Sequence, residues 1–507
     1  MKNKKQIGKN LIFNIISFAL NFCISFLFTP YLIRVVGKEA YSFFPLVNNI
    51  IGYSTILTTA VGSMAGRFVI MSLYRNDIES ANKYFNSVWV ANILLSVFFT
   101  FVAIICTLNL QYLLTIPEYL ESDVKLLFLI GALSLVFGLL TGVMGLGTYV
   151  KNRVDKEAAV KVIYNITRVL CIIALFYLFS PSIVYMSISA MVAGFVTIYF
   201  NLSFKKKLLP ELTTSPIKYF DWKYLKETIS SGIWNSVNQL SQVLSQQFDL
   251  LITNVLISAS ATGDYAIAKT APMLILHLLA MLSGTFIPHY NILYAKGEMK
   301  ELVSDVKKTM AFISIFINIP LGFLLVASKE FFDLWVPNQD SVTLYWLCFL
   351  TVFPMMFGAS VNPIYGIFGV TNKLRIPSLI LLVSSVIQTI TTLILLKTTG
   401  FGIWIIPVVA GICMIIRNTI FVTIYGAHCL GQNRWEFFPQ LLKGIIGVLV
   451  VSISCSFIMK FVIINSWKNL FFVFILTAII SSVINIFVIT NKTTRLSVVK
   501  MIKNKLS

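Results

Sequence analysis

The feature that most constrains this chain is a series of apolar runs, each about 20 residues long, separated by short loops. A helix of that length crosses the ~30 Å hydrocarbon core of a bilayer, where every backbone polar group needs an internal partner. Only 12% of the 507 residues are charged and 57% are hydrophobic. That is too little charge to cover the surfaces of soluble domains. We therefore predict an all-α membrane protein whose helical bundle includes the whole chain.

We expect about fourteen transmembrane helices. Their predicted positions are 11–36, 41–71, 84–107, 124–148, 159–180, 182–204, 228–257, 262–292, 303–328, 342–369, 376–397, 400–424, 439–463 and 467–490.

The basic residues predict the orientation of this bundle. Most of the 40 Lys and Arg residues fall on one predicted side, in the N-terminus, in Lys205 to Lys207, in the loop 296–308 and in the tail from Lys492 to Lys505. Cytoplasmic loops carry such an excess, so both termini are predicted to be cytoplasmic. The net charge of +20 is then a topology signal with some attraction to anionic lipid, and we expect no nucleic-acid partner.

The sequence offers no catalytic or metal-binding constellation. The three histidines are scattered, the seven cysteines form no CxxC pair, and no phosphate-binding Gly-rich loop is present. We predict a transporter with no cofactor, not an enzyme, driven by H⁺, Na⁺, membrane potential or consumption of its product.

Three loops recur at an offset of about 220 residues. They are VGKEAYSFFPL (36–46) with TGDYAIAKTAPML (262–274), YRNDIESANKYF (74–85) with YAKGEMKELVSDV (294–306), and LGTYVKNR (146–153) with FGVTNKLR (368–375). Because an offset of six helices preserves direction, we predict two parallel six-helix lobes related by an axis along the membrane normal. The expected parts are an N-terminal lobe (1–204), a cytoplasmic linker (205–227), a C-terminal lobe (228–430), and two extra helices with a basic cytoplasmic tail (431–507).

Polar side chains concentrate on helices that this repeat makes equivalent. In the seventh span they follow one helical face in steps of three or four residues, and the second span carries a matching stripe that ends at Arg67. Exposed to lipid, unsatisfied amides are costly, so the stripes must face protein or water. A hydrated cavity is favoured by their length, although such amides also join helices to one another.

Cations inside a membrane are functional candidates by default. The resulting candidate substrate-binding residues are Arg34, Asn48, Asn49, Arg67, Asn235, Gln239, Gln242, Gln246, Asp249, Lys269 and His277. Several alternatives remain open. Arg34 can instead extend to the membrane edge and His277 can pack, while Asp249 fits either an ion pair or a cation-coupling site.

Residues away from the predicted cavity have structural interpretations. The small-residue pair Gly138 and Gly142 is expected to pack against a neighbouring helix. Arg168 and Arg417 are expected to belong to structural ion pairs.

The stretch NFCISFLFTPYLIRVVGKEAYSFFPLVNNIIGY (21–53), the AGR motif (65–67) and the loop GTYVKNR (147–153) resemble polysaccharide-biosynthesis flippases. These form the Wzx-like branch of the multidrug/oligosaccharidyl-lipid/polysaccharide exporter superfamily, which also contains lipid II flippases and drug exporters. The resemblance covers nearly the full length. It implies a V-shaped bundle that turns over a polyprenyl-pyrophosphate-linked oligosaccharide in the bacterial inner membrane, with Arg34, Arg67 and Lys269 as cavity cations and residues 439–490 as a groove for the lipid tail.

The resemblance also implies partners and an alternative function. The partners are the lipid-linked oligosaccharide, membrane lipids, and a glycan polymerase or glycosyltransferases, and a monomer suffices for transport. Asp249 departs from a purely cationic cavity. The alternative is therefore a cation-coupled multidrug or metabolite antiporter of the same superfamily.

Overall fold

The computed structural model describes residues 2–151 and 153–489. The predicted basic tail from Lys492 to Lys505 and the repeat residue Asn152 lie outside the described residues. All regular structure in the described part is helical, as predicted. The chain divides into two compact units, one ending at Gly263 and the other beginning at Asp264 within helix α14.

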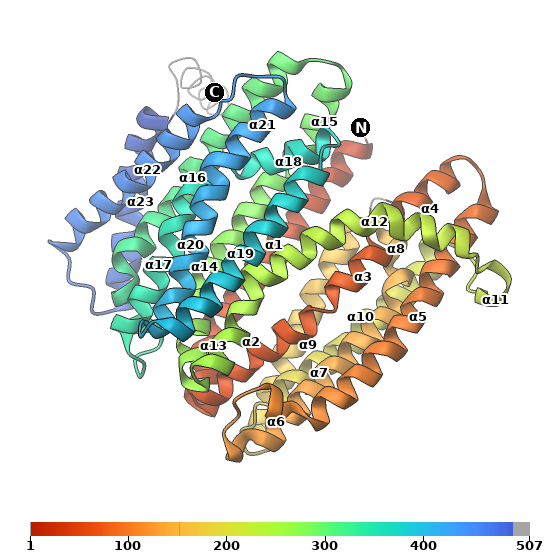
Figure 1. Cartoon of the computed structure of the whole chain (residues 1–507), viewed down its shortest axis with the longest axis horizontal. Helices are drawn as coiled ribbons and strands as arrows, with labels where there is room; N and C mark the ends of the chain where they lie inside the picture. Colours follow the sequence, from red (N-terminus) through yellow and green to blue (C-terminus); the bar gives the residue numbers. More distant parts are fainter. Residues whose placement is uncertain (1, 152, 490–507) are drawn as a thin grey trace. The chain divides into compact units, whose positions relative to one another are not determined.

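The first unit is built around long helices that run side by side, with α7 next to α5 and α10, and α9 next to α10 and α1 (Figure 1). Its helices are α1 (Lys2–Val36), α2 (Lys38–Gly52), α3 (Thr55–Gly62), α4 (Ala65–Tyr74), α5 (Ile78–Leu108), α6 (Leu110–Leu113), α7 (Glu121–Gly142), α8 (Leu146–Val150), α9 (Val154–Leu178), α10 (Tyr185–Leu208), α11 (Pro216–Tyr219), α12 (Trp222–Gln242), α13 (Phe248–Leu256) and the start of α14 (Ala259–Gly284). Short 3₁₀ turns occur at Glu118–Leu120 and Val143–Gly145, and a π-helical turn at Val243–Gln247 joins α12 to α13.

The second unit is organised around α16, which packs against α15, α17, α22 and α23 (Figure 1). Its remaining helices are α15 (Ile287–Ala295), α16 (Met299–Trp335), α17 (Ser341–Ala359), α18 (Asn362–Val370), α19 (Arg375–Thr398), α20 (Ile405–Ile416), α21 (Thr423–Cys429), α22 (Phe438–Met459) and α23 (Trp467–Ile489). A 3₁₀ turn at Gly402–Trp404 precedes α20, and a π-helical turn at Arg417–Val422 joins α20 to α21.

Thirteen stretches in the described residues are helical, long and apolar enough to cross a membrane. They correspond to the predicted spans with one exception. The predicted span 228–257 is helical as α12 and α13, but its amides and its carboxylate make it too polar to meet the same standard. Several predicted spans contain breaks: the span 41–71 is divided into α2, α3 and α4, and the span 342–369 into α17 and α18.

Two of the three matched loop pairs share a backbone pattern as well as a sequence. In the loop 74–85 the amide of Asp77 donates to the Ser72 carbonyl at 2.9 Å. In its counterpart, the loop 294–306, the amide of Glu298 donates to the Leu293 carbonyl at 3.0 Å. Both pairs lie 221 residues apart, since 298 minus 77 and 293 minus 72 give the same offset. Such six-to-one bonds close a helix through a left-handed residue. Asn76 (φ 58°) and Gly297 (φ 75°) occupy that position.

The third pair of loops repeats the six-to-one hydrogen bond. The amide of Arg153 bonds the Thr148 carbonyl at 2.6 Å, and that of Lys373 bonds the Phe368 carbonyl at 2.8 Å, an offset of 220 residues. The local structure therefore repeats at two of the three sequence matches. It does not repeat at the match of 36–46 with 262–274, because Gly37 (φ 88°) separates α1 from α2 whereas residues 262–274 lie within α14.

The boundaries of the two lobes stay a prediction. The predicted second lobe begins at residue 228, whereas the first compact unit continues to Gly263. The reason is that α12 packs along α3 and α13 packs against α2.

Candidate substrate-binding sites

The polar stripe of α12 forms a hydrogen-bonded seam with α2 and α3. Four side chains make its bonds: Asn235 Nδ2 to Ser63 Oγ (3.2 Å), Ser236 Oγ to the Ile56 carbonyl (2.7 Å), Gln239 Nε2 to Thr55 Oγ1 (3.0 Å) and Asn49 Nδ2 to the Gln247 carbonyl (3.2 Å). The helices can approach this closely because Gly232 has no side chain. A Cβ there would collide with the Ala60 carbonyl. Three predicted site residues, Asn49, Asn235 and Gln239, thus meet in a helix–helix interface.

Other predicted residues lie beside this seam with exposed side chains. They are Asn48 on α2, Gln242 at the end of α12 and Gln246 in the π-helical turn. Asp249, in the first turn of α13, is buried, and its Oδ1 accepts a 2.8 Å hydrogen bond from the Leu250 amide. The stripe therefore has two parts, one that joins helices and one that stays accessible.

The two predicted arginines of the first unit are exposed and lie far apart. Arg34 occupies the last turn of α1, and Arg67 the first turn of α4. The stretch from Lys38 to Arg67 contains about 30 residues, so it extends about 45 Å at the rise of a helix. One phosphate group cannot contact both guanidinium groups at once.

Lys269 and His277 belong to the part of α14 that lies in the second unit. The Lys269 side chain is buried, and its Nζ lies 5.4 Å from the centroid of the Tyr265 ring. A cation at this distance from an aromatic face is stabilised by the ring quadrupole. The His277 side chain is exposed.

A crevice between α7, α9 and α10 contains residues that the sequence did not single out. It consists of two adjoining cavities of about 220 and 460 Å³, which share Tyr164, Thr197 and Asn201. Ser134 and Thr141 line the smaller cavity. This set of hydroxyls, an amide and an aromatic ring is the kind that binds sugars.

Glycines keep the crevice open. A Cβ on Gly138, Gly142 or Gly194 would meet no atom within 4 Å. The expectation that Gly138 and Gly142 pack against a neighbouring helix is therefore wrong. Their spacing of four residues is the same whether a helix or a cavity faces them, so sequence alone could not distinguish the two.

Charged groups lie at one end of the crevice and along α9. Lys161 and Glu157, which both line the larger cavity, form a 2.8 Å ion pair. Arg168 lies one helical turn beyond Tyr164 on α9, and its Nε is buried without a hydrogen-bond partner in the described part of the chain. Arg417, in the second unit, has a buried Nε of the same kind. Neither arginine forms the ion pair we expected among the described residues.

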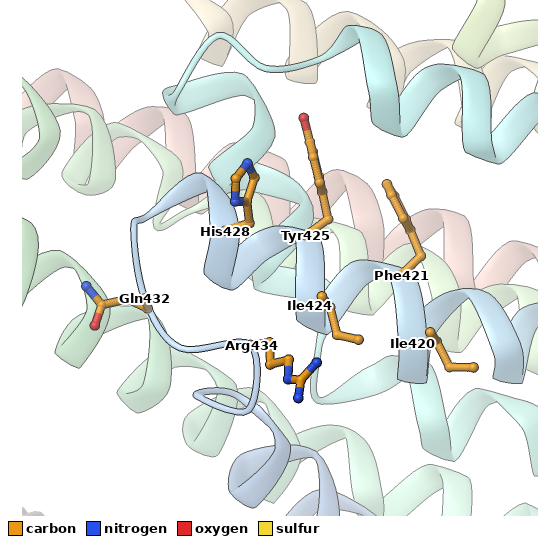
Figure 2. A pocket seen from close by; sticks show the side chains of 7 residues that line it. All are labelled: Ile420, Phe421, Ile424, Tyr425, His428, Gln432 and Arg434. Carbon is orange, nitrogen blue, oxygen red and sulfur yellow. The ribbon is translucent and has the colours of Figure 1, made fainter.

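The second unit contains a cavity of about 460 Å³ beside α21 (Figure 2). Phe421, Tyr425 and His428 extend in one direction from successive turns, and the Phe421 and Tyr425 rings stack with centroids 5.2 Å apart. Gln432 and Arg434 come from the following loop. The cavity thus combines aromatic faces with one cation and one amide. Within the described residues, no three His, Cys, Asp or Glu side chains lie close enough to hold a metal ion.

Comparisons with known proteins identify the family of the chain. Residues 7–290 match the family described as "Polysaccharide biosynthesis protein". The chain is 27% identical over 465 residues to an uncharacterized membrane protein, EpsK, of Bacillus subtilis (strain 168). The aligned region covers 91% of each of the two chains.

Solved structures share its fold. Lipid II flippase MurJ in an inward closed conformation has a TM-score of 0.68 at 15% identity, covering 94% of this chain and 97% of the other. An inward-facing multidrug resistance MATE family transporter of the MOP superfamily has a TM-score of 0.61 at 14% identity, covering 83% of this chain and 98% of the other.

Proposed function

We propose that this chain, which belongs to the polysaccharide biosynthesis protein family, moves a polyprenyl-pyrophosphate-linked oligosaccharide from one leaflet of the membrane to the other. Its family and its fold make it a multi-pass membrane transporter of the MOP superfamily rather than an enzyme. The finer proposal is that the cargo is a polysaccharide repeat unit, carried by alternating access between two lobes (1–204 and 228–430) joined by the linker 205–227.

The observation that carries this proposal is the sign of the charges at the predicted site positions. Arg34, Arg67 and Lys269 are cations at predicted site positions, against the single carboxylate of Asp249. Guanidinium groups bind phosphate through two parallel hydrogen bonds, and an ammonium group supplies a point charge. A pyrophosphate head group matches this balance, while a cationic drug does not.

The spacing of the arginines supports a cargo that moves in steps. Because Arg34 and Arg67 lie near opposite ends of α2 to α4, a pyrophosphate would contact them one after the other. The accessible amide Asn48 lies between these ends on α2. Gln242 and Gln246 belong to the segment that Asn49 bonds through the Gln247 carbonyl, and all three amides suit sugar hydroxyls. The roles of Asn49, Asn235, Gln239, Asp249, Lys269 and His277 in binding belong to the same proposal.

A second candidate function is cation-coupled antiport of a drug or metabolite. The buried carboxylate of Asp249 favours it, because a buried acid can bind H⁺ or Na⁺. The three cations at the other predicted site positions argue against it.

The proposal extends to the cellular setting. The protein would lie in the bacterial cytoplasmic membrane with both termini in the cytoplasm, act as a monomer, and receive its cargo from glycosyltransferases or deliver it to a glycan polymerase. The excess of lysine and arginine in the loops 205–227 and 296–308 supports this orientation.

Reconstitution in liposomes tests the function directly. The vesicles contain a fluorescent polyprenyl-pyrophosphate oligosaccharide, and a membrane-impermeant quencher added outside reports the fraction exposed. With the wild-type protein we expect nearly all of the fluorescence to be quenched, whereas protein-free vesicles retain the inner-leaflet share. Arg67→Ala and Lys269→Ala should slow equilibration at least ~10-fold, because each removes a charge-assisted hydrogen bond worth about 1.5–3 kcal/mol.

The matched control is Arg75→Ala, which removes an exposed cation just outside α4. Equal loss in all three variants would mean that net charge, not these positions, matters. If the lipid does not equilibrate but a small cation is taken up in a manner that depends on Asp249, the antiporter is the correct function.

A further inference from the structure

The linker between α10 and α12 is fixed to the start of α5. We call residues 209–222, which include the first residue of α12, the strap. Three buried side chains of α5 bind the backbone of the strap. Asn82 accepts from the Thr213 amide (2.7 Å) and donates to the Glu211 carbonyl (3.4 Å), and Asn86 donates to the Thr213 carbonyl (2.9 Å) and accepts from the Ser215 amide (2.9 Å). The Ser87 hydroxyl accepts from the Asp221 amide (3.0 Å) and donates to the Asp221 carbonyl (3.1 Å). The strap therefore has a defined position and is not a loose tether.

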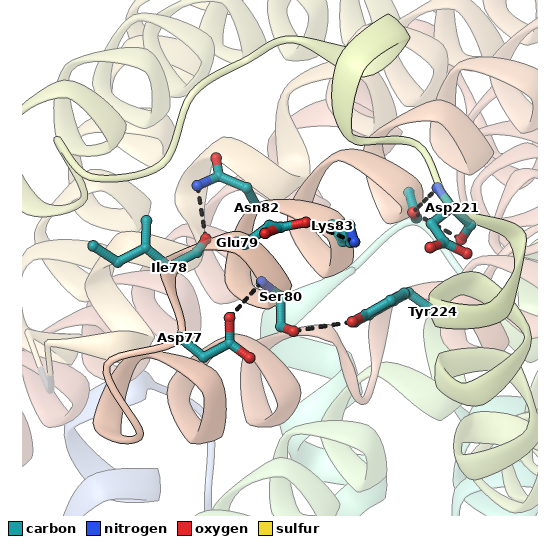
Figure 3. Close-up of polar contacts among 9 residues, drawn as sticks. Asp77, Ile78, Glu79, Ser80, Asn82, Lys83, Asp221 and Tyr224 are labelled. Atoms are coloured by element: carbon teal, nitrogen blue, oxygen red, sulfur yellow. Dashed lines mark hydrogen bonds and ion pairs between the residues drawn. The ribbon is translucent and has the colours of Figure 1, made fainter.

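The first turns of α12 reinforce the attachment. Ser80 and Tyr224 share a 3.0 Å hydrogen bond, and the Tyr84 hydroxyl donates to Glu227 at 2.8 Å. Figure 3 shows Asp221 and Tyr224 facing the side chains of α5, with Asp77 accepting from the Ser80 amide at the start of that helix. Both ends of the strap are thus held against one helix.

The strap presents three large apolar side chains that are exposed, one of them completely. Ile217 is fully exposed, Trp222 is 64% exposed and Phe220 is 42% exposed. Exposed apolar side chains at neighbouring positions usually mark a contact with a partner or a membrane. Since the backbone around them is hydrogen-bonded, this exposure is a property of the folded state.

The charges around these apolar residues have one dominant sign. Residues 205–227 contain six lysines and three carboxylates. Each carboxylate is already engaged: Glu211 pairs with Lys151 at 3.0 Å, Asp221 accepts from the Lys223 amide at 2.9 Å, and Glu227 accepts from Tyr84. The exposed lysines Lys218, Lys223 and Lys226 have no such local carboxylate partner among the ion pairs of the described residues.

The predicted span of α5 begins at residue 84, and the strap is bound to residues 82–87. The predicted span would therefore put the strap at the level of the membrane surface. Interfacial anchors place Trp, Phe and Ile at the boundary between head groups and acyl chains, with lysines beside them. Lysines near an anionic leaflet are attracted to its lipids.

We infer that the strap is an interfacial anchor, in which Ile217, Phe220 and Trp222 insert into the cytoplasmic leaflet and the neighbouring lysines bind anionic phospholipid head groups. The inserting side chains belong to none of the candidate substrate-binding sites, and the inference rests on the proposed orientation of the chain but not on its proposed cargo. Its ligand class is an anionic glycerophospholipid of the surrounding bilayer.

The test places an environment-sensitive fluorophore on the full-length protein in nanodiscs. Ile217→Cys carries the label, and Thr214→Cys, an exposed polar position three residues earlier on the same strap, is the matched control. Both variants carry Cys23→Ala, which removes the exposed native cysteine. The nanodiscs contain phosphatidylcholine alone or mixed with phosphatidylglycerol, and lipids brominated high in the acyl chain serve as quenchers.

We expect the label at position 217 to have blue-shifted emission and several-fold stronger quenching than the label at 214, with a further increase when phosphatidylglycerol is present. Replacing Lys218, Lys223 and Lys226 together with Gln should abolish that increase and leave the quenching in phosphatidylcholine unchanged. Equal quenching at 217 and 214 would overturn the insertion and point to a protein partner on this surface. Quenching at 217 that does not respond to phosphatidylglycerol would overturn the anionic-lipid assignment.

Discussion

Removing one amide side chain should release the linker from α5. Asn86 is fully buried and makes two bonds to the strap, donating to the Thr213 carbonyl and accepting from the Ser215 amide, each at 2.9 Å. A protein hydrogen bond contributes about 0.5–1.5 kcal/mol net, so Asn86→Ala should destabilise the attached strap by about 1–3 kcal/mol. The helix itself keeps its backbone bonds, because alanine has the highest helix propensity.

Hydrogen–deuterium exchange of the reconstituted protein measures this change locally. An amide that exchanges by local opening exchanges faster by the factor set by the lost free energy, tenfold for each 1.4 kcal/mol. We therefore expect peptides covering 211–217 to exchange roughly 5- to 150-fold faster in Asn86→Ala. Peptides from α7, which none of these hydrogen bonds joins to the strap, should be unchanged.

Asn109→Ala is the matched control, since the exposed Asn109 side chain bonds only the Ile105 carbonyl of its own helix at 2.9 Å. It should leave the exchange of the strap as in the wild type. The reasoning is refuted if the strap of the wild-type protein is already fully exchanged at the earliest time, or if Asn86→Ala changes nothing there.

Three further results are expected. Gly232→Ala should lower the unfolding temperature in detergent, at a cost of about 1–3 kcal/mol, because the new methyl group meets a backbone carbonyl. Gly62→Ala should leave the unfolding temperature unchanged, because a Cβ at that position would meet no atom within 4 Å. Equal effects of the two substitutions would contradict the close approach of α12 and α3. Burial raises the pKa of Glu211, but a backbone hydrogen bond and the Lys151 ammonium outweigh it, so its net pKa lies below the ordinary 4.5. The stability from this pair is therefore present above pH 4.5 and lost as the pH falls below it, and Lys151→Gln should weaken that acid sensitivity in exchange measurements on the strap. Gly194→Leu should fill the crevice and slow lipid equilibration without changing the unfolding temperature, so normal transport by a folded variant would exclude the crevice from the cargo path.

Apolar runs predicted the helical spans well because lipid permits few other structures. The sequence was less informative for α12. Its polar residues required a polar environment, but they did not indicate whether that environment is a neighbouring helix or water. Hydrogen bonds to α3 and contact with water satisfy the same amides, and Gln239 and Gln242 on one stripe have different surroundings. Long-range partners were equally hidden. Asn82 and Asn86 are separated from the strap by 127 to 131 residues, and no local pattern links them to it.

The π-helical turn at Val243–Gln247 has a consequence for comparing this chain with its relatives. A π-helical turn contains one residue more than an α-helix needs over the same length. Deleting one residue there would restore the regular backbone ladder and rotate everything beyond it by about 100°. Relatives with an uninterrupted helix should therefore align with a single-residue gap inside a membrane span. An alignment that forbids such gaps would assign the position of Asp249 to the wrong residue in each of them.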